Sequence, residues 1–467
     1  MVEFNRRDFL RLGGTGLALG ALAPYAPVFQ NRFMSQAVHA ASVSGTAKRL
    51  IFIFLRGGCD ALNTVIPHGD TDYNDTADSR PGLYIAPGES IDLNGFAALH
   101  PKLAKLSEVQ LAGDLCTLHK VAMNGQSRSH FSSETYWENG DPGNLDLEEG
   151  WLNRYLANDA LLSQSPISGA SIASQLQTMF KGSLVVPQFS RLQDYTLGTS
   201  NAAAKLIGAA PNGDLGSGLL GVFSRTPDAS DYDPVLRENG KVLGGSLAAL
   251  QTVNPNTYVP QGGATYPDSS TTTEPDFQNG TADRFFERIK AAVQLIKETD
   301  CRVMGIDLGG FDNHSNQGRL EGNHPRLLHM LAHAIQSIRR DLSAGGSTDW
   351  DDTLVVVGSE FARTSKENAS DGTDHGHAGA MFVAGGCVNG LGLGGVSGVY
   401  NADPTTWAIG DIFQENDRYL IMRTDYRAIY AEIMERHLGV APGDLDSIIP
   451  GWSALTGSEY NYLNFLP

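Results

Sequence analysis

The chain has 467 residues, of which 41% are hydrophobic and 18% are charged, so it is long enough to bury a large core in one or more domains. It contains 34 Lys and Arg against 52 Asp and Glu, and this acidic balance argues against a nucleic-acid binder, because phosphate backbones require clustered basic side chains. The four cysteines are scattered, with no C-x-x-C pair, which argues against a thiolate zinc site or a disulfide scaffold.

Residues 1–40 have the features of an export signal. Arg6 and Arg7 resemble the twin-arginine motif, a weakly apolar stretch follows, and residues 38–40 are small enough for a signal peptidase. A cytoplasmic helix that happens to contain two arginines is the alternative, and it would not explain why these features come in order. We expect export of the folded protein by the twin-arginine translocase to the periplasm or the medium. The mature chain would then carry 30 basic and 50 acidic residues, a net charge of −20.

The mature chain has no further segment of the ~20 apolar residues that a membrane span needs, so no stable membrane anchor is expected. It opens with an unbroken apolar run over residues 49–55, which is typical of a strand buried on both faces of a parallel sheet. We expect further strands at 115–121, 302–308, 353–357 and 380–384.

Helices are predicted between these strands. One begins near Ser129, and the apolar spacing of Phe285, Ile289, Val293 and Ile296 predicts another before the third strand. A third helix covers 327–342, and a fourth is capped by Thr424 and Asp425 and continues to His437. Helices that alternate with buried strands predict an α/β sheet covered on both faces.

One domain is expected over residues 48–467. Residues 190–280 differ from the rest because they are rich in Gly, Ser, Thr, Asn and Pro. We interpret this segment as a loop-rich insertion, such as a lid or rim, within that domain.

Chemically active residue types gather where the predicted strands end, which is where open α/β sheets bind ligands. The candidate metal ligands are Asp60, Asp312, His314, Glu360, Asp374, His375 and His377. So many acids and imidazoles with few nearby cations are costly unless a metal neutralises them. Each has a simpler interpretation when it is taken alone. Asp60 could be a helix cap or turn former, Asp312 and His314 could belong to a surface loop, Glu360 could be a partner of Arg363, and residues 374–377 could be an exposed polar loop.

Carboxylate and imidazole ligands suit zinc, manganese, iron, magnesium or calcium, and this number of candidates fits two ions better than one. Two metals can hold both oxygens of an in-line displacement. Ser129, at a helix start, is the best nucleophile; Ser127 and Ser132 are less well placed, and a water molecule is the alternative. The candidates for binding a phosphate or sulfate group are Arg56, Asn63, Arg128 and Arg363.

Several motifs in this order resemble the domain of unknown function 1501 family from about residue 48 to the end. They are the twin-arginine leader, Arg56–Asn63, Ser129–Phe131, Gly310–His314, Ser359–Phe361 and Gly372–Gly376. That family is similar to the alkaline phosphatase and sulfatase superfamily, which implies a three-layer α/β/α sandwich around a mixed, mostly parallel sheet. The resemblance also implies metal-assisted hydrolysis of phosphate or sulfate esters.

Within this resemblance, Asp60 matches the first metal acid, and Ser129 matches the nucleophile region. Asp312 and His314 match an Asp/His pair, and Asp374 with His375 or His377 matches the later ligands. Glu360 follows the fourth strand where the superfamily usually has an Asp-His pair.

The sequence therefore predicts an exported metallohydrolase that acts on a small-molecule or glycan ester. Two alternatives stay open. The chain could be a non-catalytic, metal-stabilised periplasmic binding or assembly factor, or a phosphotransferase that modifies envelope glycans.

Overall fold

The computed structural model describes residues 47–195, 242–250, 253–390 and 398–467, apart from positions 76, 126, 244 and 248. The predicted export signal and much of the predicted insertion lie outside these residues. In the described part of the chain, no helix has both the length and the apolar character needed to cross a bilayer.

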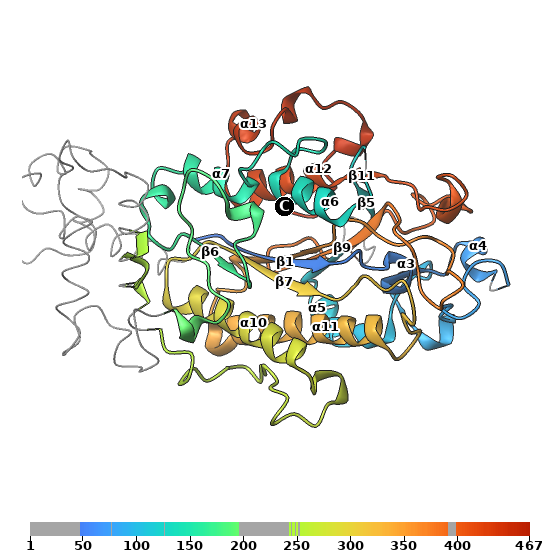
Figure 1. Cartoon of the computed structure of the whole chain (residues 1–467), viewed down its shortest axis with the longest axis horizontal. Coiled ribbons are helices and arrows are strands. Elements are labelled where there is room, and N and C mark those ends of the chain that lie inside the picture. Colours follow the sequence, from blue (N-terminus) through green and yellow to red (C-terminus); the bar gives the residue numbers. More distant parts are fainter. Residues whose placement is uncertain are drawn as a thin grey trace, which may run out of the picture.

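A mixed sheet forms the centre of the molecule, with strand order β10-β5-β9-β8-β1-β7-β6 and with β11 beside β5 (Figure 1). The strands are β1 (Arg49–Arg56), β5 (Leu115–Ala122), β6 (Gly169–Ile172), β7 (Val303–Gly309), β8 (Thr353–Gly358), β9 (Gly379–Ala384), β10 (Val399–Tyr400) and β11 (Thr424–Asp425). Every pairing between them is parallel except those of β9 with β5 and β8. A small antiparallel sheet contains β2 (Val65–Pro67), β4 (Ala97–Leu99) and β3 (Ile91–Asp92).

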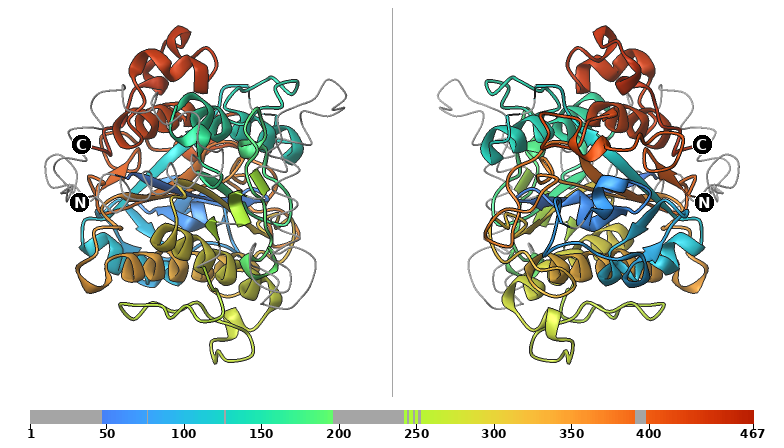
Figure 2. Two further views of the ribbon diagram at one scale, coloured as in Figure 1. Left: turned by 90° about the vertical axis from the view of Figure 1, so that its left-hand side faces the viewer. Right: turned by 90° about the vertical axis from the view of Figure 1, so that its right-hand side faces the viewer.

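Helices cover both faces of the main sheet, as Figures 1 and 2 show. One face carries α5 (Leu106–Leu111), α10 (Gly280–Glu298) and α11 (Asn323–Leu342), and the other carries α6 (His130–Asn139), α7 (Trp151–Asn158), α12 (Tyr426–Glu432) and α13 (Leu445–Ile448). Two short helices, α3 (Ala61–Thr64) and α4 (Thr71–Asn74), follow β1 and β2.

The alternation of side chains along β1 explains the two layers of core. Ile51, Ile53 and Leu55 pack with the residues of α10 and α11, whereas Leu50, Phe52 and Phe54 pack with those of α7 and α12. Because successive strand residues point to opposite faces, a continuous apolar run fits a strand covered on both sides. The expected α/β sheet is thus confirmed.

The five predicted strands and the four predicted helices are all present, with ends that differ by a few residues. Asp425 accepts a hydrogen bond from the Arg427 amide and caps α12, as predicted, although the last turn of that helix, Ile433–His437, is a π-helix. The sequence analysis missed β6, β10 and β11, which have two to four residues each and therefore too short a pattern to detect.

The direction of β9 decides where the candidate site lies. Since β9 alone runs opposite to its neighbours, the segment that precedes it starts at the edge where β1, β7 and β8 end. The loops after β1, β7 and β8 and the loop before β9 therefore meet at one edge of the sheet.

Candidate metal centre

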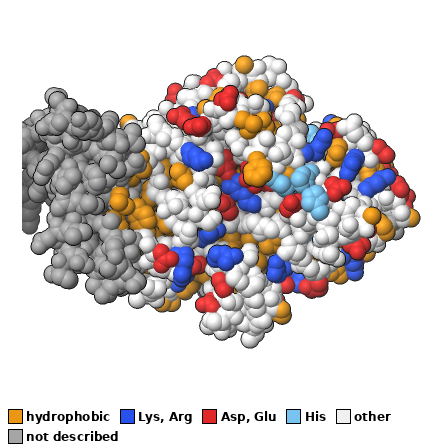
Figure 3. Space-filling model, viewed as in Figure 1, with side chains coloured by type: hydrophobic (Ala, Val, Ile, Leu, Met, Phe, Trp, Pro, Cys, Tyr) orange, Lys and Arg blue, Asp and Glu red, His pale blue; other side chains and the backbone are white. Residues whose placement is uncertain are grey.

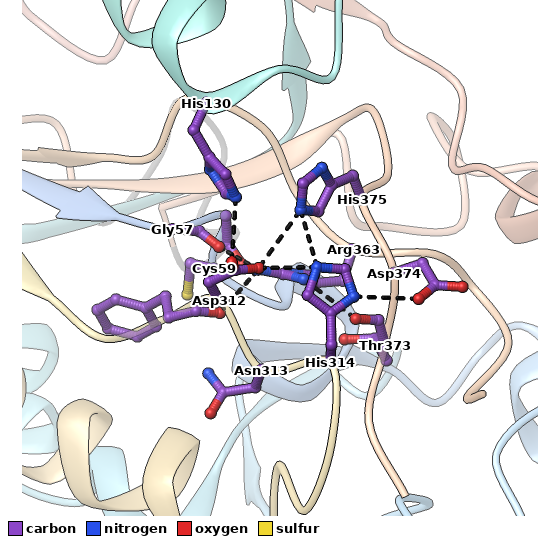
Figure 4. A network of polar contacts seen from close by, with 12 residues as sticks. Gly57, Cys59, His130, Asp312, Asn313, His314, Arg363, Thr373, Asp374 and His375 are labelled. Atoms are coloured by element: carbon purple, nitrogen blue, oxygen red, sulfur yellow. Dashed lines mark hydrogen bonds and ion pairs between the residues drawn. The ribbon is translucent and has the colours of Figure 1, made fainter. Parts of the chain in front are cut away.

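Four side chains converge at this edge: His130, Asp312, His314 and His375 (Figure 4). The Nε2 atom of His314 lies 3.0 Å from Asp312 Oδ1 and 3.0 Å from His375 Nε2. His375 Nε2 lies 3.3 Å from Asp312 Oδ1, and His130 Nε2 lies 3.4 Å from Asp312 Oδ2. Asp312 thus joins the cluster, since His314 and His375 face its Oδ1 and His130 faces its Oδ2. The ligand atoms of His130, Asp312 and His375 all lie within 4.8 Å of one another.

Each of the three imidazoles is held by its other nitrogen. His130 Nδ1 lies 2.7 Å from Glu360 Oε1, His314 Nδ1 lies 3.1 Å from Asp374 Oδ1, and His375 Nδ1 lies 2.8 Å from the carbonyl oxygen of Arg128. Since all three partners only accept hydrogen bonds, each Nδ1 carries a proton. When the rings are neutral, their Nε2 atoms present lone pairs, and this is how metal-binding histidines are oriented.

The distances fit a metal ion. Ligand bonds of about 2.1 Å in a tetrahedral site separate neighbouring donor atoms by roughly 3.4 Å. The distances from Asp312 to the three Nε2 atoms and between the Nε2 atoms of His314 and His375 are 3.0–3.4 Å, and the ligand atoms of His130, Asp312 and His375 all lie within 4.8 Å of one another. The Nε2 atom of His130 is buried and has no hydrogen-bond partner among the described residues, which is the state expected of a ligand atom. Three imidazoles and a carboxylate favour zinc, iron or manganese over magnesium and calcium, which prefer oxygen ligands.

The centre is open to solvent on one side. The side chains of Asp312 and His314 are 46% and 47% exposed, whereas those of His130 and His375 are about a quarter exposed. Figure 3 shows histidines grouped on this face of the molecule with charged side chains around them. A metal here would keep room for a further ligand, as catalytic sites do.

Arg363 fixes the carboxylate of the centre. Its buried guanidinium donates to Asp312 Oδ1 at 2.6 Å and to the carbonyl oxygens of Gly57, Gly58, Phe311 and Thr373. Burial raises the pKa of Asp312, but the hydrogen bond and charge of Arg363 outweigh it and hold that pKa at about 2. Asp312 is therefore ionised and ready to bind a cation at any physiological pH.

The pKa values of the two more buried imidazoles, His130 and His375, shift in opposite directions. The hydrogen bond to Glu360 raises the pKa of His130, while burial lowers the pKa of His375. Glu360 itself is buried; one of its oxygens also accepts from the amide of Gly57, and the other accepts from the hydroxyl of Ser359. Glu360 and Asp374 thus orient imidazoles instead of joining the cluster.

Close backbone approaches assemble the loops. The amide of Gly376 donates to Ala362 O at 2.7 Å and that of Ala362 donates to His377 O, so the segments after β8 and before β9 pair. Gly57 has φ +113°, and a Cβ there would lie 2.5 Å from the amide nitrogen of Asp312. Only glycine fits this turn without moving the loop that carries Asp312.

Asp60 and Asn63, a predicted ligand and a predicted substrate-binding residue, lie elsewhere. Asp60 is buried and forms an ion pair with Arg80, with 2.6 Å between Oδ2 and Nη1. Burial raises the pKa of Asp60, but Arg80 outweighs it and keeps that pKa below its usual value. Asn63 donates to Leu83 O and accepts from Arg80. We assign both residues to this internal network and leave Asp60 out of the proposed centre.

His377 and Arg56 are also engaged away from the four converging side chains. His377 Nδ1 contacts Glu415, and its Nε2 lies 3.3 Å from Met123 O. Arg56 forms ion pairs with Glu134, Glu138 and Asp307. These contacts occupy the groups that would otherwise bind a second ion or a substrate.

Arg128 and Ser129 remain beside the centre. Arg128 has φ +56°, which directs its carbonyl to His375, and its guanidinium lies 4.3 Å from the centre of the Tyr419 ring. Ser129 is exposed, directly precedes His130 and forms no side-chain cap on α6. Ser127 is occupied by a contact with Ser133 and by the amide of Ser129, and Ser132 is half-buried in the first turn of α6.

Two important residues were missed by the sequence analysis. His130 lies in a quoted motif, directly after the proposed nucleophile, and its position past the second strand was the available signal. Arg80 had no such signal, because it lies in a loop twenty residues after Asp60.

A second group of possible ligands, Glu274, Asp276 and His329, also occurs among the described residues. Here the ammonium group of Lys102 lies 2.9 Å from Asp276 Oδ2. A cation is thus already supplied by the chain, and this group is an ion-pair network between a loop and α11.

Comparison with known proteins bears on the second half of the chain. Residues 256–448 match the model of a family described as "Protein of unknown function (DUF1501)". This match supports the family resemblance over that segment, which contains Asp312, His314, Arg363 and His375. No curated protein matches the chain. A solved structure titled "Structure of PH0037 protein from Pyrococcus horikoshii" is 14% identical, covers 83% of this chain and 96% of that chain, and has a TM-score of 0.27.

Proposed function

We propose that the protein is an exported, metal-dependent hydrolase of phosphate or sulfate esters with an alkaline phosphatase-like architecture. The observation that carries this proposal is the group of His130, Asp312 and His375, whose ligand atoms all lie within 4.8 Å of one another, with His314 Nε2 3.0 Å from Asp312 and from His375. The Nδ1 atom of each ring is committed to an acceptor. We further propose one ion where the sequence favoured two, because Asp60 and His377 are occupied by Arg80 and Glu415.

The ligands of that ion would be His130, Asp312, His314 and His375, with zinc, iron or manganese as the best-fitting metals. When bound, a divalent cation supplies Lewis-acid polarisation of an ester oxygen. Glu360, Asp374 and the Arg128 carbonyl keep the three imidazoles in the tautomer that binds metal.

An anionic substrate group is supported by Arg128. Among the described residues no carboxylate pairs with its guanidinium, which is braced on Tyr419 next to the start of α6. In the proposed reaction, the Ser129 oxygen forms a bond to phosphorus or sulfur as the ester bond to the alcohol breaks. The alcohol leaves with the proton of the serine hydroxyl. Water then releases phosphate or sulfate and restores the serine hydroxyl.

The test is hydrolysis of p-nitrophenyl phosphate and p-nitrophenyl sulfate by the purified chain, with and without a chelator. We expect metal-dependent turnover that Ser129→Ala removes and Ser132→Ala, the matched control in the same helical turn, retains. Metal binding without hydrolysis of either ester class would instead favour the non-catalytic binding or assembly factor.

A further inference from the structure

Asp60 lies at the centre of a buried network that contacts the loops of the proposed ligands. Its Oδ2 accepts from Arg80 Nη1 at 2.6 Å and from Gln317 Nε2 at 2.6 Å, and its Oδ1 accepts from Arg80 Nη2 at 3.1 Å. The side chains of Asp60, Arg80 and Gln317 are all buried. Both carboxylate oxygens are therefore used by internal donors.

Gln317 connects this carboxylate to two ligand-bearing loops. It follows His314 by three residues in the loop after β7, and its Oε1 accepts from the Thr373 hydroxyl at 2.6 Å. Thr373 lies two residues before His375, and its amide donates to Asn313 O at 3.0 Å. The segments that carry Asp312, His314 and His375 are thus tied together through one glutamine.

Arg80 connects the same carboxylate to the loop after β8. Its Nε donates to Ser365 O and its Nη2 donates to Thr364 O, both at 2.8 Å. Thr364 directly follows Arg363, the residue that holds Asp312. His130 belongs to α6 and is held separately by Glu360.

We propose that Asp60 is a positioning residue: its ion pair with Arg80 and its bond to Gln317 hold the loops of Asp312, His314 and His375 in the geometry that binds metal. The inference rests on the proposed metal centre. It assigns to Asp60 a role different from the direct ligand that the sequence motifs suggest. Neutralising the carboxylate would leave Arg80 without its counter-charge and loosen three loops at once.

Asp60→Asn and Asp341→Asn form a matched pair for the test. Asp341 is an equally buried acid that pairs with Lys297 between α10 and α11, in the helical layer. Cobalt(II) is titrated into the metal-free full chain, with the visible absorption reporting coordination geometry and thermal unfolding in chelator reporting the stability of the metal-free fold. We expect Asp60→Asn to weaken cobalt binding by about 10- to 100-fold and to change the spectrum, and Asp341→Asn to do neither.

Gln317→Met keeps the inference testable if Asp60→Asn does not fold, because it removes the link to Thr373 and leaves the ion pair intact. It should also weaken cobalt binding, which a direct-ligand role of Asp60 does not predict. Cobalt binding by Asp60→Asn or Gln317→Met that equals the wild type, with the same spectrum, overturns the inference and leaves the proposed function standing. A wild-type chain that binds no cobalt overturns the proposed function, and this inference with it.

Discussion

The Nε2 atoms of His314 and His375 lie 3.0 Å apart, although the Nδ1 atom of each ring already donates to an oxygen. Two neutral imidazoles held in this way point lone pairs at each other, which is unfavourable unless a cation or a proton lies between them. Asp312, in the loop after β7, places Oδ1 3.0 Å from His314 Nε2, and His130, on α6, lies 3.4 Å from its Oδ2. The arrangement therefore predicts a stabilising cation.

Metal content should depend on His375 but not on His377. We expect about one zinc, iron or manganese ion per purified chain, lost in His375→Ala and retained in His377→Ala. With zinc at 100 times its dissociation constant, the wild type should gain about 2.7 kcal/mol in unfolding free energy, and His375→Ala much less. Elemental analysis and thermal unfolding measure both effects. Equal metal content in the two variants would contradict the assignment.

Gly57→Ala should be far more damaging than Gly95→Ala. Both glycines have positive φ, which costs an alanine about 1 kcal/mol, but a Cβ at Gly95 meets nothing within 4 Å. At Gly57 the Cβ would displace Asp312 and the hydrogen bond from the Gly57 amide to Glu360, with an additional loss on the order of 2 kcal/mol. Urea unfolding gives the stabilities, and zinc affinity should fall only in Gly57→Ala. Similar values for the two variants would argue against the close approach.

Acid should destabilise the fold below neutral pH because of buried histidines. Burial lowers the pKa values of His119 and His324 to about 3, whereas the unfolded chain takes up these protons near the model-peptide value of 6.5. The contribution of these neutral histidines to the free energy of unfolding is complete above pH 6.5. It is lost as the pH falls toward 3, since the unfolded state then binds more protons than the folded state. Each group adds a slope of about 1.4 kcal/mol per pH unit. Urea unfolding at pH 7, 6 and 5 measures it, and a flat profile would refute it.

Glu134→Gln should stabilise the protein at alkaline pH. Burial, opposed by Arg56, raises the pKa of Glu134 to about 7. A raised carboxyl pKa means that the folded state holds the extra proton between pH 4.5 and 7, so stability falls as the pH rises through this window. Removing the charge should add on the order of 1 kcal/mol at pH 8 and nothing at pH 4, as thermal unfolding at the two pH values can show. The opposite sign at pH 8 would mean that the ion pair with Arg56 outweighs the cost of burial.

Many of the strands and helices can be predicted from short stretches of the sequence. The apolar runs of β1, β5, β7, β8 and β9 and the helical spacing of α10 and α11 each occupy six or more consecutive residues, so their patterns are visible without knowledge of their neighbours. The same locality places Asp312, Glu360 and His375 next to strand ends. It also explains the failure to predict β6, β10 and β11, since two to four residues do not establish a period.

The sequence by itself determined the alternation of strands and helices and the gathering of acids and imidazoles at one sheet edge, because strand ends are local features. Only the tertiary structure decided which of these side chains lie together. Asp60 forms an ion pair with Arg80, and His377 contacts Glu415, so neither is available to the proposed centre. His130, on α6, lies beside Asp312 in the loop after β7. Whether a carboxylate faces an arginine or an open cation site depends on contacts between segments that are distant in the sequence. Such contacts cannot be predicted from the spacing of residues along the chain.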